Sequence, residues 1–452
     1  MACPLLVNVQ SHGAQWLRSL NLVSVLVTLL TCIDGKFLRA RKDQPGVEAW
    51  TAPPEYFAGT YGHKYMYLAN IVVGSDSKTF RVLVDTGSSQ LVLPSEFCNS
   101  EACRKHPRFS AAQSNSAKNT SLTLMIGYGS GPVSGHIFED RVCLPTRGDQ
   151  SAVLGEVLLQ TPPRELCARM QFLAADVEND EIANSPFDGI LGLGAASDDP
   201  AVGSPQFSFL KQLAAANKIK NAAFALHLTN NGDSELNLGG ASEQGLAGGQ
   251  MSWWSMSPLA NGYWQFSVCD LTVDGVPQHF GKLEVGIDSG TSLLAADNDL
   301  KNWMEQKLQG GSDCSSVNGM PKIGLKRHDG STLLLLPSDY IDERDGRCSL
   351  ALMPRFSRDN GQRLRLGASF LRRYVTVFDR DNARIGFGVA ADDMQAPQLV
   401  QSLFPGDSST SGECEDHEMN NALEALGSFD TDFDKVRDSD LREQQHKANS
   451  LQ

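Results

Sequence analysis

The sequence has 452 residues, more than one compact core usually holds, so two lobes or domains are expected. Hydrophobic residues make up 41% of the chain and charged residues 20%, as in a folded soluble protein, while 41 glycines and 20 prolines indicate many turns and short strands. The net charge of −14 and the lack of a basic run interleaved with aromatic residues argue against nucleic acid as a partner.

The N-terminal segment, residues 1–35, has the pattern of a signal peptide. Arg18 precedes an apolar stretch, 20–33, which ends where polar residues begin. The stretch is short for a membrane span, but the long segment before it leaves an uncleaved signal anchor as an alternative, and membrane attachment is expected only in that case. The sequence therefore predicts a protein of the secretory pathway, either secreted or in an endolysosomal or vesicular lumen.

The rest of the chain divides into regions of different character. Residues 36–60 contain four basic residues and three prolines without a sustained period, which is typical of a short pro-region or linker. From Tyr65 apolar and polar residues alternate, and strand-like runs recur through Ala391, so a mainly β fold is expected. Residues 396–452 are acidic and poor in aliphatic side chains, which predicts a disordered tail.

Two helices are expected among the strands. Asp297 can cap a helix over 297–308, because an aspartate at this position accepts a hydrogen bond from a free backbone N–H. The apolar residues of one face are Leu300, Trp303, Met304 and Leu308. A second helix is expected to start at Ser204-Pro205, because proline suits the first turn. Its inward-facing residues are predicted to be Phe207, Leu210 and Leu213.

An internal repeat is the most informative feature of the sequence. Residues 82–89, Val-Leu-Val-Asp-Thr-Gly-Ser-Ser, are echoed by residues 285–292, Val-Gly-Ile-Asp-Ser-Gly-Thr-Ser. Each copy is followed far downstream by an apolar unit that ends in glycine, at 190–192 and at 366–367. The repeat predicts two related β lobes with a cleft between them. The lobes are expected at 61–245 and 246–395.

The repeat places one carboxylate in each lobe, Asp85 and Asp288, at the end of an apolar strand. If the lobes face one another, the loop tips meet and the two side chains come within hydrogen-bonding range. Two carboxylates so close cannot both ionise easily, so they share one proton. One can then accept a proton from water while the other donates a proton to a carbonyl oxygen, a reaction that needs no metal and no covalent intermediate.

The residues beside the two aspartates are predicted to support them. Thr86 and Ser289 can hydrogen-bond across the lobe interface and hold the loops together. The predicted partners of the outer carboxylate oxygens are Ser88 and Thr291. The loop glycines, which permit close approach, are Gly87 and Gly290.

From about Tyr65 to Ala391 the chain resembles the pepsin-like aspartic endopeptidases of the cathepsin D and renin type. Besides the two Asp loops, Tyr128-Gly129-Ser130-Gly131 looks like the flap hairpin of that family, in which the tyrosine closes over the substrate. Segment 186–194 resembles the one beside the first loop, and segment 374–379 resembles a strand near the end of the second lobe.

The resemblance implies a bilobal pepsin-like fold, mainly β, and an aspartic-type endopeptidase that hydrolyses peptide bonds in polypeptide substrates. It implies no cofactor and no metal, sensitivity to pepstatin-type inhibitors, and a monomer. It also implies that the flap residues contact the substrate; these are Tyr128, Gly129 and Ser130.

Eight cysteines remain outside the predicted signal peptide, and disulfides are the default in an oxidising compartment. The pairs that the resemblance implies are Cys98–Cys103 and Cys314–Cys348. Cys143–Cys167 is predicted as an added hairpin staple. Cys269 and Cys414 are then left over, either as a pair that ties the tail to the second lobe or as two free thiols. The sequon at Asn119 is either a glycosylation site or a chance match.

Three positions depart from the family pattern. Val92 stands where many relatives have a tryptophan that hydrogen-bonds the flap tyrosine, so Tyr128 needs another partner or moves more freely. Arg365 takes a position that is usually apolar, and Ala368 replaces an acidic residue of several acid-active relatives, which leaves the pH optimum open. An inactive peptide-binding relative is the main alternative, supported by Arg365, whereas a glycoside hydrolase would not need the duplicated loop.

Overall fold

The computed structural model describes residues 46–48, 50–51, 66–128, 131–145, 165–178, 185–195, 204–229, 234–240, 246–308, 314–344, 347–355, 361–391 and 393–405. All of them belong to one compact unit that begins at Gln44. Strands provide most of their regular structure and their helices are short, so the predicted mainly β fold is confirmed. The predicted signal peptide and most of the acidic tail lie outside the described residues.

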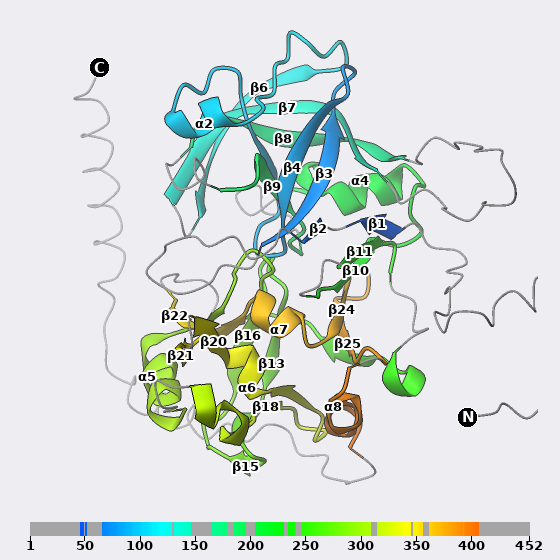
Figure 1. Cartoon of the computed structure of the whole chain (residues 1–452). Coiled ribbons are helices and arrows are strands. Elements are labelled where there is room, and N and C mark those ends of the chain that lie inside the picture. Colours follow the sequence, from blue (N-terminus) through cyan, green and yellow to red (C-terminus); the bar gives the residue numbers. More distant parts are fainter. Residues whose placement is uncertain are drawn as a thin grey trace, which may run out of the picture. The chain divides into compact units, whose positions relative to one another are not determined.

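An eight-stranded sheet forms most of the first half of the chain (Figure 1). Its strands, in spatial order, are β2 (Trp50–Thr51), β3 (Tyr67–Val73), β4 (Lys78–Asp85), β9 (Gly189–Gly192), β5 (Leu91–Pro94), β8 (Glu165–Val177), β7 (Gly131–Pro145) and β6 (Lys118–Tyr128). Alternation decides which side chains are buried, because successive residues of a strand face opposite sides of the sheet. In β3 the residues that face the main core are Tyr67, Ala69, Ile71 and Val73. Helix α2 (Glu101–Lys105) follows β5 and is capped by Ser100.

Three smaller sheets belong to the second half. The sheet that leads to the second Asp loop has the order β13 (Gln265–Val268), β16 (Leu283–Ile287), β23 (Gln362–Leu366), β17 (Leu294–Ala296) and β22 (Leu352–Pro354). A four-stranded sheet has the order β15 (Val276–Pro277), β14 (Asp270–Val273), β18 (Ile323–Lys326) and β19 (Thr332–Leu335). The third sheet is a two-stranded hairpin of β20 (Ile341–Arg344) and β21 (Arg347–Leu350). The short helices of this half are α6 (Pro337–Tyr340), η4 (Cys314–Gly319) and α7 (Ala368–Leu371).

A six-stranded sheet joins the two halves. Its order is β1 (Gly46–Glu48), β11 (Glu235–Leu238), β10 (Ala223–His227), β24 (Val375–Asp379), β25 (Arg384–Gly388) and β12 (Ser252–Ser255). Figure 1 shows β10 and β11 between the two halves, with β24 and β25 below them. The lobe boundary expected at 245/246 does not separate these strands, because β10 pairs with β24 and places Phe224 opposite Phe378.

Part of the segment expected to be a pro-region or linker is built into the sheets. Strand β1 pairs with β11 and brings Val47 opposite Leu236, while β2 pairs with β3 and brings Trp50 opposite Leu68. The assignment of residues 36–60 as a pro-region or linker stays a prediction, and these two strands are an addition to it. Very short edge strands are held by backbone hydrogen bonds, so they leave no period in the sequence.

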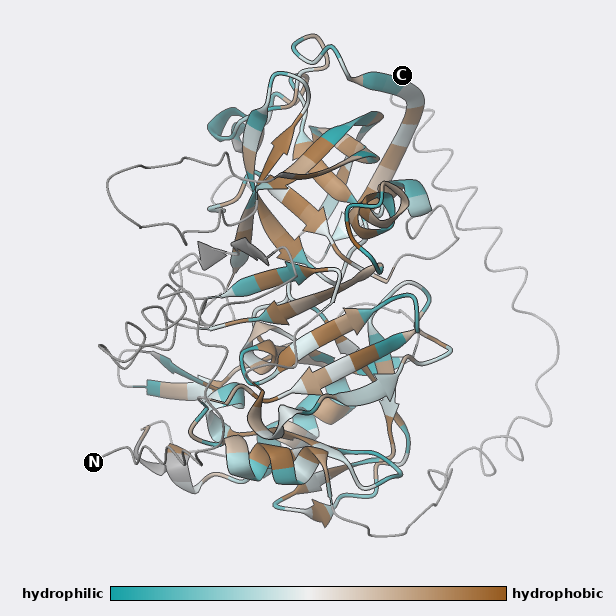
Figure 2. Ribbon diagram, turned by 90° about the vertical axis from the view of Figure 1, so that its right-hand side faces the viewer, coloured by the Kyte–Doolittle hydropathy of each residue, from teal (hydrophilic) through white to brown (hydrophobic). Residues whose placement is uncertain are grey.

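Aromatic side chains fill the core where the halves meet. The ring of Phe224 stacks on Phe378 at 4.5 Å and lies 5.9 Å from Trp264, edge to face. The indole N–H of Trp264 donates to the carbonyl oxygen of Leu193 at 2.8 Å, which fastens the second half to the segment after β9. Figure 2 shows hydrophobic residues along the strands of these sheets.

The helix predicted over 297–308 is present as α5 (Asn298–Lys307). The side chain of Asp297 accepts the backbone N–H of Leu300 at 2.8 Å, so the aspartate caps the helix as predicted. The buried residues of the predicted face are Leu300, Met304 and Leu308. Trp303 is half-buried and packs edge to face on Phe280.

The second predicted helix is divided in two. A 3-10 turn, η2 (Pro205–Phe207), is followed by α4 (Phe209–Ala215), and the side chain of Ser208 accepts the backbone N–H of Lys211 to cap α4. The predicted inward-facing residues Phe207, Leu210 and Leu213 are all buried. The prediction was therefore right in its buried face and missed the cap inside the segment.

The second half extends beyond the boundary predicted at residue 395. Residues Ala396–Leu403 form helix α8, in which Ala396, Leu399 and Leu403 are buried, so the disordered tail predicted from residue 396 is corrected over 396–405. Their spacing puts three apolar side chains on one helix face, and packing of this face against the β19 region outweighs the polar composition of the tail as a whole.

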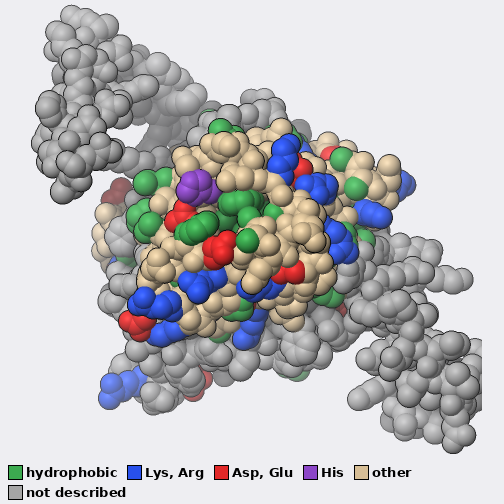
Figure 3. All heavy atoms as spheres, turned by 90° about the horizontal axis from the view of Figure 1, so that it is seen from above, with side chains coloured by type: hydrophobic (Ala, Val, Ile, Leu, Met, Phe, Trp, Pro, Cys, Tyr) green, Lys and Arg blue, Asp and Glu red, His purple; other side chains and the backbone are tan. Residues whose placement is uncertain are grey.

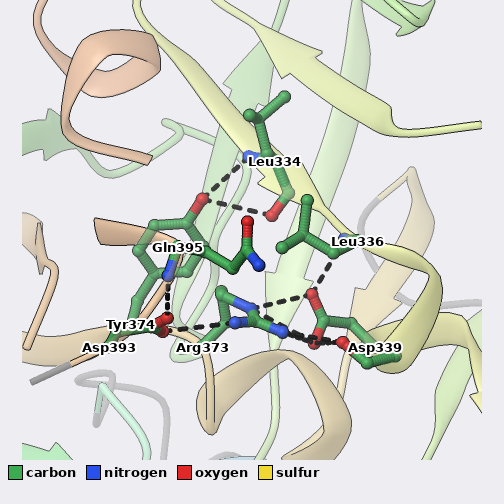
Figure 4. A network of polar contacts seen from close by, with 8 residues as sticks. Leu334, Leu336, Asp339, Arg373, Tyr374, Asp393 and Gln395 are labelled. Carbon is green, nitrogen blue, oxygen red and sulfur yellow. Dashed lines mark hydrogen bonds and ion pairs between the residues drawn. The ribbon is translucent and has the colours of Figure 1, made fainter. Parts of the chain in front are cut away.

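Ion pairs hold the chain just before α8. Arg373 forms a salt bridge with Asp393 at 3.2 Å and a second one with Asp339 at 2.7 Å, and Figure 4 shows the guanidinium between these carboxylates. The hydroxyl of Tyr374 donates to the carbonyl oxygen of Leu334 at 3.1 Å and accepts the N–H of the same residue at 2.8 Å. These contacts explain why the chain remains attached to the second half past residue 391.

Candidate active site

Two buried strands deliver the predicted carboxylates. Asp85 is the last residue of β4 and Asp288 directly follows β16, and each strand pairs in parallel with a strand from the glycine unit of its own half. The carbonyl oxygen of Asp85 accepts the N–H of Leu193 at 2.7 Å, and the N–H of Asp288 donates to Leu366 at 3.0 Å. Both aspartates are buried, each residue being 6% exposed, and backbone hydrogen bonds hold them in place.

Four hydrogen bonds fasten the two Asp loops to each other. The N–H of Thr86 donates to Oγ of Ser289 at 3.0 Å, and the N–H of Ser289 donates to Oγ1 of Thr86 at 2.9 Å. Each hydroxyl also donates to a backbone carbonyl oxygen of the opposite half, Thr86 to Ile287 at 3.3 Å and Ser289 to Val84 at 2.7 Å. The structure thus brings together the two hydroxyl residues that were predicted to bridge the lobes.

The two carboxylates accept the same pattern of hydrogen bonds. Oδ1 of Asp85 accepts the N–H of Gly87 at 2.9 Å, and Oδ2 accepts the hydroxyl of Ser88 at 2.5 Å. The corresponding distances at Asp288 are 2.8 Å to the N–H of Gly290 and 2.7 Å to the hydroxyl of Thr291. Each carboxylate is therefore oriented by its own loop, with one backbone and one hydroxyl donor.

The loop glycines allow the carboxylates to approach. A Cβ atom at Gly87 would lie 2.5 Å from Cγ of Asp288, and a Cβ atom at Gly290 would lie 2.4 Å from Oδ1 of Asp85. Each aspartate is therefore packed against the glycine of the opposite loop, where a side chain of any other residue would displace it.

Asp85 holds a proton more tightly than an isolated aspartate does. Burial raises the pKa of Asp85, the charge of Asp288 raises it further, and the hydrogen bonds from Ser88 and Gly87 act in the opposite direction. A side-chain hydrogen bond with Asp288 also raises the pKa of Asp85. Two adjacent carboxyl groups that share one proton are chemically suited to activating a water molecule against a carbonyl group.

Comparison with known proteins identifies the family. The profile of the family described as "Eukaryotic aspartyl protease" matches residues 66–390. The chain belongs to this family. The protease is 30% identical to pepsin A of Bos taurus over 336 residues, which cover 72% of this chain and 84% of the pepsin.

Other relatives give the same result. The protease is 30% identical to gastricsin of Homo sapiens over 381 residues, 79% of this chain and 90% of gastricsin. It is 28% identical to chymosin of Callithrix jacchus over 333 residues, 72% of this chain and 81% of the chymosin. The resemblance inferred from the motifs is confirmed, and the protein is an aspartic-type endopeptidase that acts on polypeptide substrates.

The predicted flap of the protease is the hairpin of β6 and β7. Tyr128 ends β6 and pairs with Gly131, the first residue of β7, whereas Gly129 and Ser130 lie outside the described residues. The ring of Tyr128 packs against a small apolar cluster that contains Val92, which is 1% exposed. Aliphatic packing thus occupies the site where relatives were expected to have a tryptophan.

The hydroxyl of Tyr128 is buried near the dyad. Burial and the charge of Asp85 raise its pKa, and the neighbouring Ser88 hydroxyl lowers it in part. The Tyr128 hydroxyl has no hydrogen-bond partner of normal geometry among the described residues. Ser88, which donates to Asp85, is therefore a polar group close to the Tyr128 hydroxyl.

The outer part of the hairpin is exposed and partly apolar. Met125 is 71% exposed and Leu122 57% exposed on β6, and Val177 at the end of β8 is 59% exposed. Figure 3, which views this end of the molecule, shows hydrophobic side chains gathered among charged ones. Strand β6 therefore has no fully buried residue, whereas β7 contributes Val133, Ile137 and Phe138 to the core.

The two departures beside the second loop have different surroundings. Nη1 of Arg365 lies 3.2 Å from Oδ2 of Asp288, so this arginine contacts one member of the pair. Ala368 begins α7 and is fully buried. Sequence reasoning singled out Arg365 and missed Gln362, which bonds to it at 3.1 Å. The alternation Gln-Arg-Leu-Arg-Leu over 362–366 could have indicated a strand with one polar face.

The structure contains three of the predicted disulfides, and these are Cys98–Cys103, Cys143–Cys167 and Cys314–Cys348. Cys269 is also disulfide-bonded, which rules out a free thiol at this position. Cys414 lies outside the described residues, so its pairing with Cys269 stays a prediction. Asn119 is exposed on β6, and its glycosylation also stays a prediction. Among the described helices, none is long and apolar enough to cross a bilayer.

Proposed function

We propose that Asp85 and Asp288 are the catalytic residues of this endopeptidase and activate one water molecule between them. The observation that carries the proposal is the matched set of hydrogen bonds, in which each carboxylate accepts one loop N–H and one hydroxyl. The four bonds between Thr86 and Ser289 and the opposite loops would keep the carboxylates in this arrangement.

The chemistry follows from one shared proton. The ionised carboxylate accepts a proton from water as the water oxygen attacks the peptide carbonyl carbon, and the protonated carboxyl donates its proton to the carbonyl oxygen. In the second half of the reaction the C–N bond breaks and the leaving nitrogen takes a proton from the pair. Orientation of both groups before the substrate arrives lowers the cost of reaching this transition state.

The β6–β7 hairpin is proposed to cover the bound substrate. Tyr128 would close over the cleft with Gly129 and Ser130, and closure would exclude water from the reacting groups. The exposure of β6, where Met125 is 71% exposed and no residue is fully buried, supports movement of this strand.

We further propose that the protease works as a monomer in the lumen of the secretory pathway, as a secreted or endolysosomal enzyme. The disulfides support an oxidising compartment. Sequencing the N-terminus of the protein from the culture medium would test removal of residues 1–35, and an intact N-terminus in a membrane fraction would support the signal anchor instead.

The catalytic proposal is tested by digestion of a denatured protein over a pH series, with and without pepstatin. Asp85→Asn and Asp288→Asn keep the shape of each side chain and are expected to lose at least about a thousandfold in rate. The control is Asp176→Asn, which alters an aspartate bonded to Ser95 and His136. Cleavage that persists in either catalytic variant would remove that residue from the dyad.

A peptide-binding role is the second candidate, and the contact of Arg365 with Asp288 favours it. A wild-type protein from which the N-terminal segment has been removed, and which binds pepstatin but cleaves no substrate at any pH, would support this hypothesis. Cleavage that pepstatin inhibits would exclude it.

A further inference from the structure

Arg365 gives the dyad an asymmetry that the internal repeat does not predict. Its guanidinium lies 3.2 Å from Oδ2 of Asp288, and the two side chains are 19% and 9% exposed. A positive charge at this distance stabilises the negative form of a carboxylate, and low exposure weakens screening by solvent.

The first half has an apolar residue at the matching position. Arg365 pairs with Gly286, two residues before Asp288, and Ile190 pairs with Leu83, two residues before Asp85. Ile190 is 7% exposed and packs in an apolar cluster with Leu83. The matching strand position is therefore apolar in the first half and cationic in the second.

A chain of hydrogen bonds holds the guanidinium in place. Nε of Arg365 donates to Oε1 of Gln362 at 3.1 Å, the amide of Gln362 donates to Gln265 at 3.2 Å, and Gln265 donates to Glu284 at 2.8 Å. Glycine at 286 makes room for this chain, because a Cβ there would lie 1.9 Å from Nε2 of Gln362. The arginine is thus positioned by the folded protein before any substrate binds.

Several other titratable groups face the dyad. Tyr128 approaches from β6, and Glu284 on β16 is linked to Asp288 through Gln265, Gln362 and Arg365. Within the residues that the structure describes, Asp85 takes part in no ion pair with a cation. Burial and the charge of Asp288 raise the pKa of Asp85, which agrees with a proton on Asp85.

We propose that Arg365 is a positioning residue that keeps Asp288 ionised and so leaves the shared proton on Asp85, which makes Asp288 the base and Asp85 the acid of the first step. The proposal rests on the catalytic roles given above to both aspartates. It adds a division of labour that the symmetric loops alone do not define.

The resulting reaction balances. Asp288 takes a proton from water as the water oxygen bonds to the carbonyl carbon, and the carbonyl oxygen gains an electron pair and the proton of Asp85. The C–N bond then breaks, the nitrogen keeps the electron pair and takes the proton from Asp288, and a hydroxyl of the intermediate returns its proton to Asp85 as the carbonyl re-forms. Both carboxyl groups return to their starting states.

The test is the pH dependence of kcat/KM for a fluorogenic peptide between about pH 2.5 and 8.5, because its limbs report the free enzyme's dyad. Arg365→Met is expected to move both limbs to higher pH by about one to three units, because both ionisations lose a nearby cation. Arg365→Lys, which keeps the charge, should restore most of the wild-type profile. Arg363→Met is the matched control on the same strand, since Arg363 pairs with Asp297, and its limbs should not move.

The outcomes separate the two proposals. Limbs of Arg365→Met that coincide with those of the wild type, with activity lowered equally at every pH, would overturn the role of Arg365 while the dyad stands. If Asp288→Asn cleaves the peptide at the wild-type rate, both the catalytic role of Asp288 and the role of Arg365 are refuted. If Arg365→Met does not fold, Arg365→Gln removes the charge and is expected to give the same upward movement.

Discussion

Glu178 provides a direct test of how burial controls ionisation in this protein. It follows β8, is 6% exposed, and its Oε2 lies 3.3 Å from Sγ of Cys103. That sulfur is in a disulfide and carries no proton, so only a protonated Glu178 can form a hydrogen bond in this contact. Burial raises the pKa of Glu178 from 4.5 to about 7, although the charge of His106 lowers it.

The sign of the effect on stability follows from this direction. Below about pH 4.5 both the folded and the unfolded chain carry a protonated Glu178, and the side chain costs nothing. As the pH rises towards 7 the unfolded chain releases its proton first, so the folded state loses stability. A difference of about 2.5 pKa units corresponds to about 3 kcal/mol once the pH is above 7.

We therefore expect Glu178→Gln, which cannot ionise, to match the parent at pH 4 and to exceed its free energy of unfolding by about 3 kcal/mol at pH 8. Guanidinium denaturation followed by tryptophan fluorescence measures the difference, with Asp85→Ala in both proteins to prevent self-digestion. The control is Glu139→Gln on β7, a partly exposed glutamate paired with Arg169, where a pH-dependent change below about 0.5 kcal/mol is expected. A gap between Glu178→Gln and its parent that is the same at pH 4 and pH 8 would refute the reasoning.

Three further substitutions test other contacts. Gly87→Ala would bring a Cβ to 2.5 Å from Cγ of Asp288. We therefore expect kcat/KM for peptide cleavage to fall at least about a hundredfold, while the circular dichroism spectrum stays unchanged. A loss below about tenfold would contradict the tight fit of Asp288 against this glycine. Thr86→Val leaves the buried backbone N–H of Ser289 without its acceptor. The free energy of unfolding, measured in urea, is therefore expected to fall by about 1 to 3 kcal/mol. Unchanged stability would contradict a contribution of this hydrogen bond. Arg373→Met leaves Asp339, which is 4% exposed, without its cation, and should cost about 3 to 5 kcal/mol at pH 7. Because burial raises the pKa of Asp339, the loss should be smaller at pH 4, and equal losses at both pH values would count against the ion pair.

The amino-acid sequence by itself predicts the dyad because the chemistry is contained in short contiguous motifs. Asp85 and Asp288 each end an apolar strand and precede a hydroxyl residue and a glycine, and a motif that occurs twice in order is strong evidence. Helix α5 could be predicted for the same reason, since its cap, Asp297, and its apolar face follow from the spacing of neighbouring residues.

Contacts between distant segments could not be predicted from such local motifs. The pairing of β10 with β24 joins residues on either side of the expected lobe boundary, and nothing local to Phe224 or Phe378 indicates it. Helix α8 was missed because its three buried residues lie at the start of a polar tail, and only the surface that receives them makes the helix stable.

Arg365 illustrates the limit most clearly. Its identity could be noted from the chain alone, but whether a charged residue at this place disturbs the site, faces solvent or pairs with a carboxylate depends on three strands that meet in space. Local patterns settle which residues form a strand, cap or loop, because those preferences act between near neighbours. The ionisation of charged and buried polar groups depends on partners that folding brings in from elsewhere, and so a position for the proton of this dyad could be proposed only from the folded chain.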